Sequence, residues 1–256
     1  MRELNAIATL AYRDLVKLLR DPMRIISTFL FPLMFIFILG GSMREMVDEY
    51  EFMDYVFTGV LGQTLFQSAA LGVIWLIDDR EHDFSQEIFV SPISRYTIIL
   101  GKISGETLVA WSQGLGILAF GFLAGVHFTF QQLVALTWSG LVACLFGGAF
   151  GVMVLSNLSS RRAADQIFPF IMLPQYFLAG VFNQVRVLPW YLDVLSKLSP
   201  MRYAVDLVRG AFYAGRPDYE AVVLLPLPVN AALIATAFTV FLVIGTFLFV
   251  RSERNR

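Results

Sequence analysis

The chain has 256 residues, of which 57% are hydrophobic and only 15% are charged. In soluble domains roughly a quarter of all residues are charged, so this composition excludes an ordinary soluble domain. The formal net charge of −1 gives no electrostatic reason to expect a nucleic-acid partner. A single cysteine cannot form an internal disulfide.

Long runs without Asp, Glu, Lys or Arg occupy about half of the sequence, at residues 25–43, 55–77, 107–160, 166–185 and 221–250. About 20 helical residues cross a hydrocarbon core about 30 Å thick. Four runs fit one crossing each, and the third is expected to reverse near residues 127–132. A backbone in lipid must satisfy its own hydrogen bonds, so the runs predict six membrane-spanning helices.

The predicted fold is an all-α integral membrane protein with a single transmembrane domain over residues 1–256. Its spans are expected at residues 24–43, 55–77, 103–126, 132–156, 166–185 and 224–250. With the N-terminus inside, 13 of the 19 Lys and Arg residues face the cytoplasm. This excess favours a multi-pass protein with both termini cytoplasmic.

Residues 1–22 precede the first span and form an amphipathic pattern. Apolar residues recur there at helical spacing: Leu4, Ala8, Ala11, Leu15 and Leu18. Cations gather on another face: Arg13, Lys17 and Arg20. This pattern predicts an interfacial helix near anionic lipid headgroups, or alternatively a helix packed on a partner.

Residues 79–92 follow the second span and are strongly charged. Phe84 and Ile88 share one helical face, beside Glu81 and Glu87. An apolar spot in an acidic rim predicts a short cytoplasmic helix that docks a partner. The alternative is a solvated connector without a partner.

Residues 187–213 lie between the fifth and sixth spans and contain two amphipathic stretches rich in Trp and Tyr. These aromatic side chains favour the interface between membrane and water, so we expect short re-entrant helices on the outer side. Arg202 and Asp206 are four residues apart and are expected to pair.

Polar side chains inside the predicted spans are the candidates for a pathway. Gln63 and Gln67 share a face of the second span, with Phe66 beside them. Such side chains either line a pathway or bridge helices by hydrogen bonds, and both interpretations stay open. Lys102 and Glu106, four residues apart at the start of the third span, predict an ion pair near the inner surface.

The order of several short motifs adds a family resemblance. The first set is Arg80-Glu81, Glu87, Val90-Ser91-Pro92-Ile93-Ser94-Arg95 and Gly101-Lys102. The second set is Phe177-Leu178-Ala179-Gly180-Val181-Phe182, Leu188-Pro189, Leu198-Ser199-Pro200, Tyr203-Ala204 and Arg209. On a six-span chain, these motifs resemble the permease subunits of type-2 ABC exporters, the ABC-2-like permeases.

The resemblance implies a permease dimer, of two identical copies or close paralogues, in a prokaryotic cytoplasmic membrane. It implies two copies of a separate cytoplasmic ABC ATPase subunit, which binds ATP and Mg²⁺. The helix at residues 79–92 would couple to that ATPase, through Arg80, Glu81, Phe84, Glu87, Ile88 and Pro92. Spans two and five would form the substrate path, through Gln63, Phe66, Gln67, Gln175 and Tyr176.

The residues themselves agree with this division of labour. The chain has no Gly-rich phosphate loop of the type Gly-x-x-x-x-Gly-Lys-Ser/Thr, so we expect ATP hydrolysis by a partner and not by this chain. Its two histidines and one cysteine form no cluster with metal-ligand spacing, so we expect no catalytic residue, metal or cofactor in it. The scarcity of charge in spans two and five favours an amphipathic or hydrophobic substrate, such as a drug or lipid. A permease for a lipid-linked glycan, or a membrane anchor or assembly factor without transport, remains as an alternative.

Overall fold

The computed structural model describes residues 2–42, 51–74, 77, 94–155, 158, 160–182 and 185–254. The elements in these ranges are α1 (Arg2–Leu19), α2 (Pro22–Ser42), α3 (Phe52–Gly72), α6 (Arg95–Leu123), α7 (Phe130–Leu155), α8 (Arg161–Leu178), the 3₁₀ helix η1 (Val185–Val187), α9 (Trp190–Leu198), α10 (Pro200–Phe212), α11 (Tyr219–Val222) and α12 (Leu227–Arg254). These ranges contain no strand, so the all-α prediction is confirmed for the described chain.

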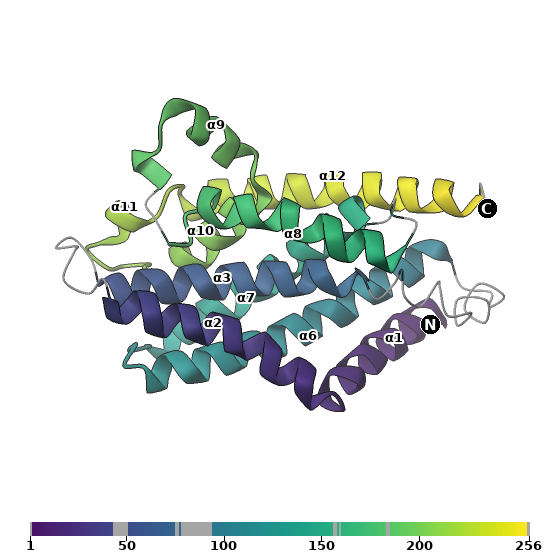
Figure 1. Cartoon of the computed structure of the whole chain (residues 1–256), viewed down its shortest axis with the longest axis horizontal. Coiled ribbons are helices and arrows are strands. Elements are labelled where there is room, and N and C mark those ends of the chain that lie inside the picture. Colours follow the sequence, from purple (N-terminus) through teal and green to yellow (C-terminus); the bar gives the residue numbers. More distant parts are fainter. Residues whose placement is uncertain are drawn as a thin grey trace.

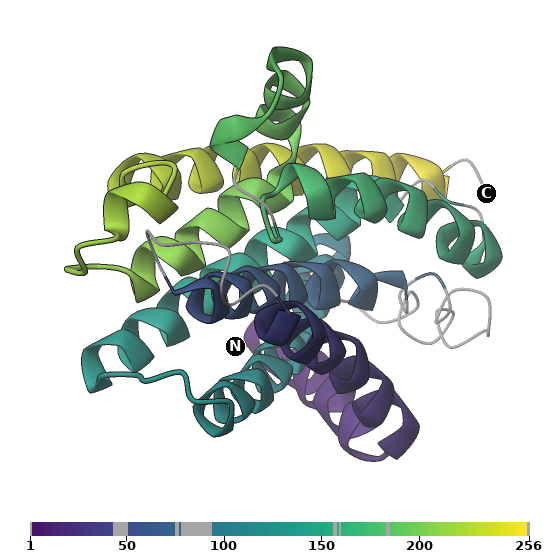
Figure 2. The same cartoon turned by 60° about the vertical axis from the view of Figure 1, so that its left-hand side comes forward.

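The long helices run back and forth along the longest axis of the molecule (Figure 1). Helix α3 lies at the centre, packed against α6, α7 and α10, and 17 of its 21 residues are buried. Helix α1 begins and α12 ends at the same end of that axis. Figure 2 shows α9 and α1 on opposite sides of the bundle.

Aromatic rings fill the contact between α3, α7 and α12. Phe66 of α3 lies 5.5 Å, centroid to centroid, from both Phe146 and Phe150 of α7. Phe241 of α12 lies 5.6 Å from the same two α7 rings. Each such pair contributes about 0.5–1.5 kcal/mol beyond the burial of its area, so this cluster fixes the central packing.

Three helices in the described chain are long and apolar enough to cross a membrane: Tyr96–Leu123, Phe130–Val154 and Tyr219–Phe249. The first two arise from the single apolar run at residues 107–160. Helix α6 ends at Leu123 and α7 begins at Phe130, so the predicted reversal inside this run is confirmed.

The fourth apolar run, residues 166–185, which is the fifth predicted span, forms a helix with other bounds than expected. Helix α8 begins earlier, because the Ser160 hydroxyl accepts a hydrogen bond from the Ala163 N–H at 3.2 Å and caps the first turn. It ends at Leu178, and Gly180 follows at a φ of 73°, which favours glycine. Its 18 residues extend over about 27 Å.

The segment at residues 187–213 forms the two short helices α9 and α10, and their expected re-entrant position stays a prediction. Helix α9 is exposed, with Trp190 at 80% of its full exposure, but α10 is buried within the bundle along most of its length. The expected pair of Arg202 and Asp206 is replaced by separate partners. Arg202 donates to the Ser196 hydroxyl at 2.8 Å, and Asp206 accepts from backbone N–H groups of the α11–α12 connection.

Candidate functional site

A neutral polar cluster joins α3 to α8 inside the bundle. Gln63 is 4% exposed, and its Nε2 donates to Oε1 of Gln67 at 3.4 Å. The hydroxyl of Tyr176 on α8 lies near both amides. We call Gln63, Gln67 and Tyr176 the glutamine–tyrosine cluster. The fold therefore brings together three of the five residues that were expected to line a substrate path.

The other two expected path residues lie elsewhere. Phe66 is fully buried in the aromatic contact with α7. Gln175 is 6% exposed, and its Oε1 accepts from the Ser199 hydroxyl and from the Met201 N–H, each at 3.2 Å. Gln175 therefore binds the beginning of α10 to α8, and a substrate-contacting role for either residue stays a prediction.

A second group of polar residues lies between α1 and α6. Lys102 Nζ lies 2.9 Å from Asp14 Oδ2 and 2.7 Å from Glu106 Oε1, and all three side chains are at most 4% exposed. We call these residues the buried ion triad. The predicted pair of Lys102 and Glu106 is confirmed. Asp14 was missed, although its position three residues after Ala11 and four before Leu18 places it on the buried face of α1.

The buried ion triad holds three helices at close range. A Cβ on Gly105 of α6 would lie 2.9 Å from Asp14 Oδ2, so the absence of a side chain lets α1 approach. The Glu106 carboxylate lies directly against Gly72, the last residue of α3. Arg13 adds a second cation, 3.2 Å from Asp14 Oδ1. Charges removed from water require paired geometry, so this contact fixes how α1 and the end of α3 sit on α6.

At the other end of the bundle, one arginine binds α10 to α3. Arg209 is 1% exposed, and its guanidinium lies 3.7 Å from the centroid of the Tyr55 ring. Its Nη2 also donates to the backbone carbonyls of Tyr55 and Val181, each at 3.3 Å. Arg209 therefore ties α10 to α3 and to the chain that leaves α8, which gives this motif residue a structural role.

The expected coupling helix, residues 79–92, lies outside the described residues, as do all six of its candidate contacts: Arg80, Glu81, Phe84, Glu87, Ile88 and Pro92. Their coupling role stays a prediction. The part of the chain that the structure describes contains no group of His, Cys, Asp and Glu residues able to hold a metal ion.

The sequence profile of the ABC-2 type transporter family matches residues 5–213, which is most of the chain and includes α1 through α10. The chain belongs to the ABC-2 type transporter family. The family resemblance expected from the short motifs is thus confirmed. The glutamine–tyrosine cluster, the buried ion triad and Arg209 all lie within the matched part of this ABC-2 type chain.

Curated relatives of this ABC-2 type chain carry the names of transport permeases. The protein ycf38 of Cyanophora paradoxa is 22% identical over 213 residues, which are 80% of this chain and 73% of that protein. YbhR of Escherichia coli K12, named as a multidrug ABC transporter permease, is 28% identical over 135 residues, 51% of this chain and 36% of that protein. The inner membrane transport permease YadH of the same strain is 23% identical over 192 residues, 73% of each chain.

Proposed function

We propose that this chain is the transmembrane subunit of an ATP-driven ABC exporter in a prokaryotic cytoplasmic membrane. Two such subunits, identical or paralogous, would form the substrate path, and two copies of a separate cytoplasmic ATPase would bind ATP and Mg²⁺. Membership of the ABC-2 type family over residues 5–213 is the observation that carries this proposal.

In this proposal α2, α3, α6, α7, α8 and α12 are the six membrane crossings. Their alternating direction supports it (Figure 1). Six crossings return the chain to the side on which it started, which agrees with α1 beginning and α12 ending at one end of the bundle. The Lys and Arg distribution supports a cytoplasmic location of this end.

The second subunit would pack against α8. This helix exposes a row of large apolar side chains, with Phe170 at 81%, Leu173 at 59% and Phe177 at 60%. Tyr176 lies on the same helix, within the glutamine–tyrosine cluster. A partner on the exposed row would therefore place this cluster close to the interface between subunits.

The glutamine–tyrosine cluster would contact substrate along that interface. Its amides and phenol offer hydrogen bonds without any formal charge, in a setting otherwise rich in apolar side chains. This chemistry suits an amphipathic or hydrophobic compound, of the drug or lipid type. A strongly charged headgroup would lack a counter-charge in the cluster itself.

The ATPase would dock on residues 79–92 and near α1. The end of α3 that precedes residues 79–92 lies against Glu106, and α1 is bound to the same triad through Asp14. A displacement of α1 or of the end of α3 would therefore move α6, because both contact the buried ion triad.

The test is the double substitution Gln63→Leu with Gln67→Leu, in proteoliposomes that also contain the ATPase. Because the double variant would lose two hydrogen bonds to the substrate, we expect the transport rate to fall about tenfold. Gln131→Leu, at an exposed position at the start of α7, is the control for an added leucine. Unchanged transport in the double variant, with the melting temperature and assembly retained, would contradict a pathway at this cluster.

A further inference from the structure

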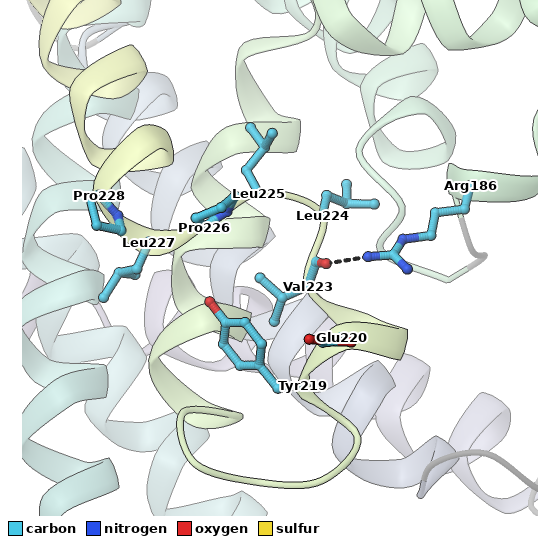
Figure 3. A pocket seen from close by; sticks show the side chains of 9 residues that line it. All are labelled: Arg186, Tyr219, Glu220, Val223, Leu224, Leu225, Pro226, Leu227 and Pro228. Carbon is cyan, nitrogen blue, oxygen red and sulfur yellow. Dashed lines mark hydrogen bonds between the residues drawn. The ribbon is translucent and has the colours of Figure 1, made fainter.

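A groove that the proposed transport path does not use lies between η1 and the beginning of α12. Its volume is about 560 Å³, within the range of about 300–1,000 Å³ that is typical of small-molecule sites. Nine residues line it (Figure 3): Arg186, Tyr219, Glu220, Val223, Leu224, Leu225, Pro226, Leu227 and Pro228. We call it the outer groove, since the proposed topology places it on the outer side.

The outer groove has a charged end and an apolar end. Figure 3 shows Arg186 and Glu220 toward one end, and Leu227 and Pro228 at the other, with Leu225 between them. The Arg186 Nη2 donates to the Val223 carbonyl at 2.6 Å, which holds the guanidinium at the rim. That bond uses one of five guanidinium N–H donors, so the group retains the capacity to bind an anion.

Hydrogen bonds to a buried carboxylate fix the backbone of the connection that lines the groove. Asp206, 2% exposed on α10, accepts from the N–H groups of Leu224 and Leu225 at 2.7 and 3.1 Å. It also accepts from Asn230 Nδ2 at 3.1 Å, at the beginning of α12. The apolar connection that forms the groove is therefore anchored to a buried carboxylate, and the groove exists before any ligand binds.

The position and chemistry of the groove together select its ligand. It lies where the apolar segment Tyr219–Phe249 begins, which is the boundary between membrane and water in the proposed topology. We propose that the outer groove binds a zwitterionic phospholipid with a primary ammonium headgroup. The phosphate pairs with Arg186, the ammonium donates to Glu220, and one acyl chain lies along Leu225 and Leu227.

Other phospholipids match this arrangement less well. An anionic phosphatidylglycerol has a phosphate for Arg186 but no cation for Glu220. Phosphatidylcholine has a cation, but its quaternary nitrogen carries no N–H to donate. Because a hydrogen bond between charged groups is stronger than a neutral one, the carboxylate of Glu220 is expected to provide the selectivity.

The experiment is native mass spectrometry of the full-length protein in detergent. Phosphatidylethanolamine, phosphatidylglycerol and phosphatidylcholine with identical acyl chains are added at equal concentration. Phosphatidylethanolamine is expected to bind about tenfold more tightly than either competitor. Arg186→Ala should weaken binding of all three lipids, whereas Glu220→Gln should abolish the preference and retain binding.

Two further variants keep the outcome decisive. Lys197→Ala removes an exposed cation from α9, outside the groove, and should leave lipid binding unchanged. Leu227→Trp enlarges a 41% exposed side chain that lines the groove, and should displace lipid without a change in melting temperature. Equal binding of the three lipids to the wild-type protein, or wild-type behaviour of Arg186→Ala and Glu220→Gln, would overturn the proposal. Neither result depends on transport.

Discussion

Buried charges define this bundle at the level of single residues. Lys102 pairs with two carboxylates, and Arg209 donates to two backbone carbonyls while it stacks on Tyr55. Each of these cations binds at least one acceptor from another helix, Asp14 of α1 for Lys102 and Tyr55 of α3 for Arg209. Removal of either cation would therefore break more than one buried interaction at once, which is more damaging than the loss of one contact.

Lys102→Met tests this view of the buried ion triad. The substitution retains most of the side-chain volume but leaves Asp14 and Glu106 as buried carboxylates without their shared cation. Breaking such a group costs about 3–5 kcal/mol, so the melting temperature in detergent should fall by several degrees or more.

Lys197→Met is the matched control, because Lys197 forms a 2.7 Å ion pair with Asp193 on the exposed helix α9. Exposed pairs contribute little to stability, so its melting temperature should stay close to that of the wild type. Equal shifts for the two variants would show that burial of the triad has no energetic consequence.

At the level of elements, the helices were predictable wherever a membrane crossing requires a long uncharged apolar run. The run at residues 107–160 is too long for one crossing, so its length predicted a reversal. The polar residues near its middle indicated where the chain would turn between α6 and α7. The end of α8 was less predictable, because the run continues without charge to Val185. Glycine is frequent in the apolar runs, so Gly180 gave no clear signal in the sequence. In the structure its positive φ follows the end of α8.

The burial of α10 and the partners of Asp14 could not be predicted, for a shared physical reason. A polar side chain on a helix face has the same sequence pattern whether it meets water or a partner buried in the protein. Asp206 was expected to pair with Arg202, but its carboxylate accepts from two backbone N–H groups that lie 18 and 19 residues further along the chain. Such partners come from tertiary contacts that periodicity does not encode.

The docking of α1 on α6 gives a prediction at this scale. Gly105→Val should separate the two helices, because even its Cβ would lie 3.1 Å from Ala11 Cα and 2.9 Å from Asp14 Oδ2. Trypsin should then cleave faster after Arg13, Lys17 and Arg20 in the loosened α1.

Ala119→Val adds volume at an exposed position of the same helix and should leave the cleavage rate unchanged. The test is the initial rate of proteolysis of α1, followed by intact mass. An unaltered rate in Gly105→Val would mean that the close approach at Gly105 does not hold α1.

At the level of the whole molecule, the proposed exporter depends on partners that this chain must recruit. In this proposal the glutamine–tyrosine cluster would contact substrate, the apolar face of α8 would meet a second subunit, and the buried ion triad would anchor the end of α3 that precedes residues 79–92. The chain has no phosphate-binding loop of its own. In the proposed exporter, the energy of ATP hydrolysis would therefore reach this chain through contact with a separate ATPase.

The most direct test is co-purification of this chain with a candidate ABC ATPase from the same cell, followed by ATPase assays in lipid with and without hydrophobic compounds. We predict a stable complex of two permease and two ATPase subunits, with ATP hydrolysis stimulated by an amphipathic compound. Phe84→Asp should abolish that stimulation while the permease still folds. A permease that purifies alone at every lipid composition, with no ATPase bound, would contradict the exporter and favour a membrane anchor.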